Sequence, residues 1–245
     1  MMKTNLSTAG YKSNRPSEPT AAELALDRFE TLVTDFYEKY RKKPSVVQSK
    51  EQKERLLQAE AEDLAFLKKK RIQLIAHAKA EELQLKLAAY TASNNTKTAN
   101  ELAAEKHHPT RMLANNLTAA GEPKPTRRHE PHHIIPGKGQ YKLTDMRRIR
   151  LNLHMHKIGI NAAENGVWLM NFAKNIDLNW ESPNSPAHRS IHTSNYETWI
   201  STRFAAFETK MHVFKANLLQ VKMNLKNGTH PPEILQSIDK NWKGV

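Results

Sequence analysis

The chain carries the stretch HEPHHIIPG at residues 129–137 and, further on, SPAHRSIH at residues 185–192. The first stretch predicts a short strand, in which adjacent side chains point to opposite faces. His132 and His133 therefore cannot do one job together, and one can face a metal ion while the other faces the substrate side.

The second stretch predicts the start of a helix. Ser185 is a favourable N-cap residue, and Pro186 suits the first helical position. His188 and His192 would then lie one turn apart on the same face. Helices chelate metal ions with this spacing, although the glutamate of the zinc-protease motif is missing. The alternative is that two exposed histidines reach this spacing by chance.

Between the two histidine stretches lies an asparagine that leads into an apolar run. Asn165-Gly166 predicts a turn, and residues 167–169, Val-Trp-Leu, predict a short buried strand. An asparagine at this point could use its side-chain carbonyl to hold an imidazole in one tautomer. The alternative is that the Asn-Gly pair is simply a turn.

The order of these pieces is more specific than any one of them: HH, then NG and an apolar strand, then H-x3-H and Tyr196. In this order the sequence resembles the AHH family of the HNH/endonuclease VII nuclease superfamily, which is found chiefly in bacterial toxins. The resemblance covers about residues 129–200. Pro131 departs from it by standing where the family has alanine, but proline is tolerated at the start of a strand.

The resemblance implies a ββα-metal fold: a hairpin, a connecting segment, and a helix that holds one divalent ion. It implies that His132, His188 and His192 bind the metal, that His133 is the general base, and that Asn165 orients His133. Three neutral imidazoles favour Zn²⁺, Ni²⁺ or Mn²⁺, while a wet and open site is also compatible with Mg²⁺.

Basic residues are concentrated around the first histidine stretch. Residues 122–161 hold nine Lys or Arg against three Asp or Glu, within a chain whose formal net charge is +13. Such a segment is either an ordinary solvated surface or a face that follows phosphates. We expect phosphate contacts from Arg127, Arg128, Lys138, Arg147, Arg148 and Arg150. Arg189, beside the predicted metal helix, is expected to contact the transition state.

Helices are predicted on both sides of this region. Residues 143–158 have one apolar helical face, and His154 and His156 are expected to decorate its C-terminal end, where positive charge is favourable. An apolar stripe over residues 196–221 predicts one long core-facing helix that ends near Gly228, followed by a short helix after Pro231-Pro232.

The first half of the chain is predicted to be helical. Thr20 with Glu23 and Ser49 with Gln52 have the spacing of capping boxes. The first predicted helix stops at Lys42-Lys43-Pro44. The stretch from residue 49 to about 90 predicts a long helix or a helical hairpin packed on a partner, with a coiled coil as the alternative.

The segment between the two halves is broken by Ser, Asn, Thr, Gly and Pro. Short helices are predicted at 98–106 and 110–119, and His107-His108-Pro109 is expected to be a solvated loop. The sequence therefore predicts a mostly α fold with a small α+β core, in three parts: a flexible tail at 1–19, a helical adaptor or packing region at 20–121, and a nuclease domain at 122–245 that ends in a long amphipathic helix.

Composition excludes several classes of protein. The chain has no cysteine, which excludes disulfides and thiolate zinc sites. It has no run of 18 apolar residues and no apolar signal core at its start, so neither a membrane span nor a secretory signal peptide is expected. A charge of +13 favours polyanionic or acidic partners.

These observations predict a metal-dependent endonuclease, a DNase with RNA as the alternative, that hydrolyses phosphodiesters to leave 5′-phosphate ends. The resemblance implies an antibacterial toxin, cytoplasmic in the producer and delivered into target cells without a signal peptide by a secretion system. It also implies an acidic immunity protein as partner. Two alternatives stay open: a phage or restriction-type HNH endonuclease, and a noncatalytic helical protein that binds nucleic acid.

Overall fold

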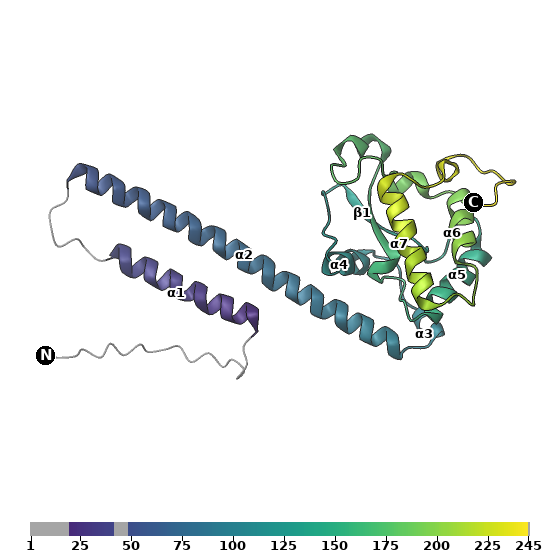
Figure 1. Ribbon diagram of the computed structural model, residues 1–245, viewed down its shortest axis with the longest axis horizontal. Coiled ribbons are helices and arrows are strands. Elements are labelled where there is room, and N and C mark those ends of the chain that lie inside the picture. The colour runs from purple at the N-terminus through teal and green to yellow at the C-terminus, as the bar shows by residue number, and fades with distance from the viewer. Residues whose placement is uncertain (1–19, 42–48, 245) are drawn as a thin grey trace. The chain divides into compact units, whose positions relative to one another are not determined.

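The computed structural model describes residues 20–41 and 49–244 (Figure 1). The predicted tail at 1–19 and the predicted stop signal at 42–44 lie outside the described residues. The chain divides into two compact units, the first ending at Lys79 and the second beginning at Ala80.

The first unit is a pair of helices. It contains α1 (Ala21–Arg41) and the first part of α2 (Lys50–Thr96). Both predicted capping boxes are confirmed, because each N-cap hydroxyl accepts from the backbone three residues on and the Glu or Gln side chain accepts in return. Asp63 of α2 accepts from Lys39 Nζ at 2.9 Å and Tyr40 Oη at 2.7 Å. Of the two structures predicted for residues 49 to about 90, the long helix is therefore the one present, and these hydrogen bonds join it to α1.

The second unit is built on two short strands, β1 (His129–His133) and β2 (Gly166–Met170). They pair antiparallel, with His133 opposite Gly166 and His132 opposite Val167. The expected hairpin is wrong, because α5 (Leu143–Met155) and the 3₁₀ turn η1 (Ala163–Asn165) lie between the strands. A two-stranded ribbon this short needs apolar packing. Val167 and Leu169 of β2 share one buried core with the apolar face of α5.

The apolar stripe over residues 196–221 does not form one helix. It is divided between α6 (Ser194–Phe204) and α7 (Met211–Asn227). Asn152 of α5 donates to the carbonyls of Phe204 and Ala206, which the end of α6 leaves without helical partners. The Phe204 and Phe214 rings then pack across the break with centroids 5.1 Å apart. The spacing of the stripe is preserved across the loop, so the sequence pattern alone could not reveal the break.

The end of α7 is as predicted, because Gly228 adopts a left-handed conformation with φ of 70°. The short terminal helix predicted after Pro231-Pro232 is a 3₁₀ turn, η4 (Pro232–Leu235). Two further 3₁₀ turns, η2 (Ala173–Leu178) and η3 (His188–Ile191), lie between β2 and α6.

The segment before β1 belongs to the second unit. The predicted short helices are present as α3 (Ala99–Ala103) and α4 (Arg111–Ala119). Leu113 of α4 packs directly on the backbone of Gly166, where a Cβ atom would lie 2.6 Å from Leu113 Cδ1. The break between the two compact units falls after Lys79 and not at the predicted boundary between residues 121 and 122, because the apolar faces of α3 and α4 are buried in the second unit.

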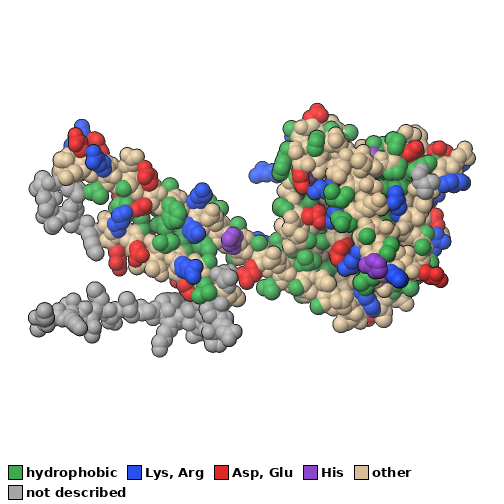
Figure 2. Space-filling model, in the orientation of Figure 1, with side chains coloured by type: hydrophobic (Ala, Val, Ile, Leu, Met, Phe, Trp, Pro, Cys, Tyr) green, Lys and Arg blue, Asp and Glu red, His purple; other side chains and the backbone are tan. Residues whose placement is uncertain are grey.

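The expected fold class is confirmed: helices surround a small α+β core. Among the described residues, no helix combines the length and the apolar character that a membrane span needs. On the face of the second unit seen in Figure 2, Lys and Arg side chains are interspersed with acidic and apolar ones.

His154 corrects an expectation for α5, because it does not decorate the helix surface. Its side chain is buried, with Nδ1 donating to Ile158 O at 2.9 Å and Nε2 accepting from Arg150 Nε at 3.1 Å. Burial lowers the pKa of His154 to about 4. The sequence pattern misplaced His154 because a histidine at the edge of an apolar stripe can face either way.

Folding should weaken in acid partly because of His154. The unfolded chain takes up this proton near pH 6.5, whereas the folded chain takes it up only near pH 4. The contribution to stability is therefore complete above about pH 6.5 and is lost as the pH falls towards 4, by at most ~1.4 kcal/mol per pH unit. In His154→Gln, whose amide retains a donor and an acceptor, the free energy of unfolding in urea should fall less between pH 7 and pH 5. His212→Gln, at an exposed site in α7, is the control, and an unchanged pH dependence in His154→Gln would contradict the prediction.

Candidate active site and metal centre

Strand β1 places its two adjacent histidines on opposite sides. His132 and Glu130 share one face of the strand, while His133 points to the other. Both histidines are buried. The alternation of side chains along the strand therefore accounts for the expected placement of the two histidines on opposite sides.

The His132 side chain lies close to two histidines from later in the chain, His188 and His192. One side-chain nitrogen from each of His132, His188 and His192 lies within 4.8 Å of the others. His188 and His192 do not lie on an α-helix as expected: His188 begins η3, and His192 ends that turn. The 3₁₀ turn still brings the His188 and His192 rings to a centroid distance of 4.8 Å. The chain is extended at Ala187, before this turn, and the next α-helix begins only at Ser194.

Two further side chains fix how these imidazoles present their nitrogens. Tyr196 of α6 donates its hydroxyl to Ile134 O at 2.9 Å and lies 3.0 Å from His132 Nε2. Since the single hydroxyl proton is used on the carbonyl, His132 Nε2 carries a proton and Nδ1 is left as the lone-pair donor. His188 Nδ1 lies 2.9 Å from Glu130 Oε2, which leaves Nε2 of His188 as its free lone pair.

The environment of the three imidazoles favours the neutral form that binds metal. Burial, reinforced by the neighbouring His188 and His192, holds the pKa of His132 well below its usual value. Burial also lowers the pKa of His188, although the hydrogen bond that His188 donates to Glu130 opposes this shift, and burial lowers the pKa of His192. Neutral imidazoles backed by a carboxylate or a hydroxyl are typical of metal centres. The donor set therefore fits one divalent transition metal ion.

His133 is held by an asparagine, but not by the one expected. Its Nε2 lies 3.0 Å from Asn161 Oδ1. The Asn165 amide is fully used on the backbone: it accepts from Ile135 N and donates to the carbonyls of Ile135 and Ile160. Asn165 therefore fixes the chain that leaves β1, and Asn161 contacts the base candidate. Burial lowers the pKa of His133 to about 4.

A cavity of about 470 Å³ opens over these histidines. Its wall includes His132, His188 and His192 on one side and His133 on the other, so the candidate metal ligands and the candidate base face the same cavity. The loop that closes it is held by Glu197 of α6, which accepts from three consecutive backbone N–H groups, those of residues 140–142.

The basic residues predicted to bind nucleic acid fall into three groups. Lys138 and Arg189 line the cavity, and Arg189 lies 4.0 Å from Glu130 Oε2. Arg150 does not fit its expected role, because its guanidinium donates to the carbonyls of Ala103, Glu105 and Gly137 and to His154. The remaining four are exposed and do not line the cavity: Arg127, Arg128, Arg147 and Arg148.

Several residues around the site were missed by sequence reasoning. His107 and His108 were expected to be a solvated loop, yet both line the cavity, and the His107 ring centroid lies 6.3 Å from that of His133. Glu130 lies inside the first histidine stretch and Asn161 lies four residues before Asn165, so their contacts could have been suspected from these positions. Nothing local to the sequence marked the 107–108 pair, because its partners are more than twenty residues away.

One comparison with known proteins gives a match, and the matched residues span this site. Residues 113–232 match a family described as AHH, a nuclease family of the HNH/ENDO VII superfamily with conserved AHH. No curated protein and no solved structure matches the chain. The matched residues contain both histidine stretches and both strands. By this match, the chain belongs through residues 113–232 to the AHH family of nucleases in the HNH/ENDO VII superfamily.

Proposed function

We propose that this nuclease is a metal-dependent endonuclease that hydrolyses DNA, with His133 as general base and His132, His188 and His192 as metal ligands. The observation that carries the proposal is that three clustered imidazoles, of which those of His132 and His188 are held in one tautomer, face the same cavity as the separately held His133. A base and a metal on opposite faces of one strand can act on the two sides of one phosphodiester.

The chain's own groups have distinct tasks in this proposal. Because Asn161 Oδ1 accepts from His133 Nε2, the lone pair of His133 is on Nδ1 and is available to take a proton from water. The lowered pKa keeps His133 neutral at pH 7, in the state that can accept this proton. Lys138 and Arg189, at the cavity wall, are placed to hold phosphate oxygens.

A divalent ion bound by the three histidines would neutralise the scissile phosphate and stabilise the leaving 3′ oxygen. Since the attacking group is water and not a ribose 2′-hydroxyl, DNA is a competent substrate, and the products would carry 5′-phosphates.

Cleavage assays with purified protein test this proposal. Supercoiled plasmid should be nicked and then linearised in Mg²⁺, Mn²⁺, Zn²⁺ or Ni²⁺, and EDTA should abolish cleavage because it removes the ion from the three histidines. Total RNA in parallel reactions measures the preference for DNA. Cleavage that survives EDTA would contradict the metal-dependent mechanism. Binding of plasmid without cleavage in any of the four ions would favour a noncatalytic nucleic-acid-binding protein instead.

We further propose that the nuclease acts as an antibacterial toxin with an acidic immunity protein as partner and a secretion system for delivery. The formal charge of +13 supports an acidic partner. A small acidic protein encoded by the adjacent gene should bind the purified chain and inhibit plasmid cleavage. A neighbouring methyltransferase or phage terminase gene would instead favour a restriction or phage endonuclease.

A further inference from the structure

A line of hydrogen bonds leads from α2 to the base candidate. Tyr90 Oη lies 3.0 and 2.9 Å from the two carboxylate oxygens of Glu105. Glu105 Oε1 accepts from Asn161 Nδ2 at 2.8 Å, and Asn161 Oδ1 lies 3.0 Å from His133 Nε2. The outer members of this line, Tyr90 and Glu105, lie before the residues matched by the nuclease family, 113–232.

The partners of Asn161 determine which way its amide faces. Nδ2 has two acceptors that cannot donate, the Glu105 carboxylate and the Lys106 carbonyl at 3.0 Å. Oδ1 must therefore face His133, because turning the amide over would place an oxygen against two acceptors. With Oδ1 as its partner, His133 carries its proton on Nε2, and the Nδ1 lone pair is free.

The segment that carries Glu105 is clamped to the active-site loop. Arg150 donates to the carbonyls of Ala103 and Glu105 and, through its other terminal nitrogen, to the carbonyl of Gly137. The His107 ring lies so close to Gly137 that a Cβ atom there would be 2.2 Å from His107 Cγ. The segment is thus tied to the cavity from both sides of Glu105.

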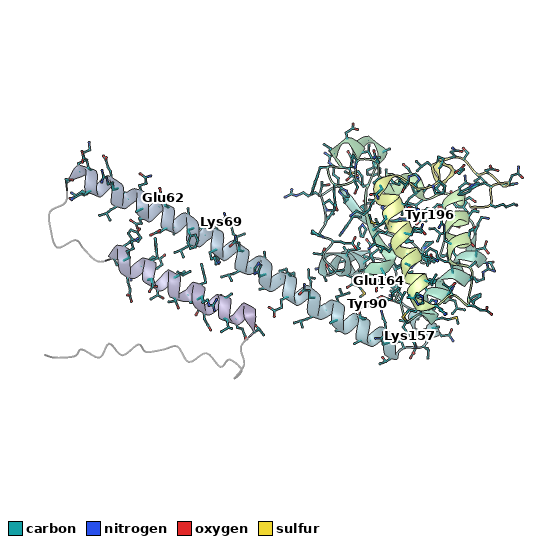
Figure 3. All side chains as sticks on the ribbon, viewed as in Figure 1. Glu62, Lys69, Tyr90, Lys157, Glu164 and Tyr196 are labelled. Carbon is teal, nitrogen blue, oxygen red and sulfur yellow. The ribbon has the colours of Figure 1, made fainter. Side chains whose placement is uncertain are left out.

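Tyr90 reaches Glu105 from within the second unit. Figure 3 labels it on the C-terminal part of α2. A Cβ atom at Gly159 would lie 2.0 Å from Tyr90 Oη, so the glycine leaves the space that the hydroxyl occupies. Gly159 is two residues before Asn161, and Tyr90 therefore supports the backbone of the asparagine as well as the carboxylate that contacts it.

We propose that Glu105 is a positioning residue of the nuclease: its carboxylate orients the Asn161 amide and thereby selects the His133 tautomer that can accept a proton. This inference rests on the proposed function of His133 as general base. Without the carboxylate, the amide is held only by the Lys106 carbonyl and can turn over. Its Nδ2 would then donate to His133 Nε2 and stabilise the tautomer whose lone pair is on Nε2 and faces Asn161.

Four variants test the proposal. Glu105→Ala should lower kcat for plasmid cleavage about 10-fold with KM unchanged, since loss of a supporting hydrogen-bond partner typically costs ~10–100-fold. Glu105→Gln keeps an acceptor for Asn161 Nδ2 and should therefore retain most of the wild-type kcat. Glu164→Gln removes the same charge from an exposed ion pair with Lys215 and is the control. His133→Ala reports on the underlying mechanism.

A second readout does not depend on activity. Multiple-bond ¹H–¹⁵N spectra of the metal-free protein, with His133 assigned from the signals lost in His133→Ala, report its tautomer. The wild-type protein and Glu105→Gln should carry the proton on Nε2, and Glu105→Ala should show a shift towards Nδ1. Wild-type kcat together with an unchanged tautomer in Glu105→Ala would overturn the proposal.

The two hypotheses fail in different ways. If His133→Ala cleaves plasmid at the wild-type rate, the proposed function fails. If His133→Ala is inactive while Glu105→Ala matches the wild type, only the positioning role fails. Should Glu105→Ala not fold by circular dichroism, Tyr90→Phe decides, since it removes only the hydroxyl that holds the carboxylate. It should then lower kcat and shift the tautomer in the same direction, and no change in either would overturn the proposal.

Discussion

Replacement of His133 by alanine is expected to lower kcat for plasmid cleavage by about 10²–10⁴-fold, the usual contribution of a general base. The ring is buried against Asn161 and faces the cavity that the candidate metal ligands also line. Because it lies on the opposite face of β1 from His132, its removal should leave the metal site intact. Single-turnover cleavage at saturating metal measures the loss directly.

The control for this substitution is His212→Ala, which removes an exposed histidine of α7 that does not line the cavity. It should cleave at the wild-type rate. Metal affinity of His133→Ala, measured by titration calorimetry, should match that of the wild type. A His133→Ala protein with full activity would remove His133 from the mechanism.

Replacement of His192 by alanine is expected to lower metal affinity by more than about 100-fold, because loss of a residue that merely supports a ligand already costs ~10–100-fold. His192 is the most exposed of the three candidate ligands, so this substitution disturbs the core least. Plasmid cleavage at low metal concentration should be lost with it. Calorimetry with Mn²⁺ or Zn²⁺ and activity titrated against metal concentration measure the two effects.

Glu130→Gln provides a graded comparison, because it weakens the support of His188 without removing a ligand nitrogen. The metal affinity of Glu130→Gln should lie between those of the wild type and His192→Ala, and excess metal should restore its cleavage activity. Unchanged metal affinity in His192→Ala would show that the ion is held elsewhere. The two large effects are thus separable: His133→Ala loses turnover and keeps the metal, whereas His192→Ala loses both.

Local patterns in the sequence predicted features that depend on neighbouring residues. The capping boxes at Thr20 and Ser49 formed because each needs only contacts three residues apart. The helix over 143–155 and the end of α7 at Gly228 followed from apolar periodicity and from glycine's tolerance of positive φ. The order of HH, NG and H-x3-H carried the resemblance to the AHH family, and the metal site was predicted from that resemblance.

Features that depend on distant contacts could not be predicted in this way. The stripe over 196–221 had the right spacing for one helix, but Asn152 of α5 takes the carbonyls at the break. From the sequence, Asn165 is predicted to be the residue that orients His133. Only the antiparallel pairing of β1 with β2 uses Asn165 on the backbone of Ile135 and leaves Asn161 for His133.

The stretch HEPHHIIPG at residues 129–137 by itself determined that the His132 and His133 side chains face opposite ways, since alternation is a property of any extended strand. Together with SPAHRSIH, it carries the resemblance to the AHH family, and that resemblance implied which histidines could bind a metal ion. The tertiary structure alone decided what holds each ring: Tyr196 behind His132, Glu130 behind His188, and Glu105 through Asn161 behind His133. The physical reason is that a tautomer depends on a hydrogen-bond partner brought from tens of residues away, and local spacing carries no information about that partner.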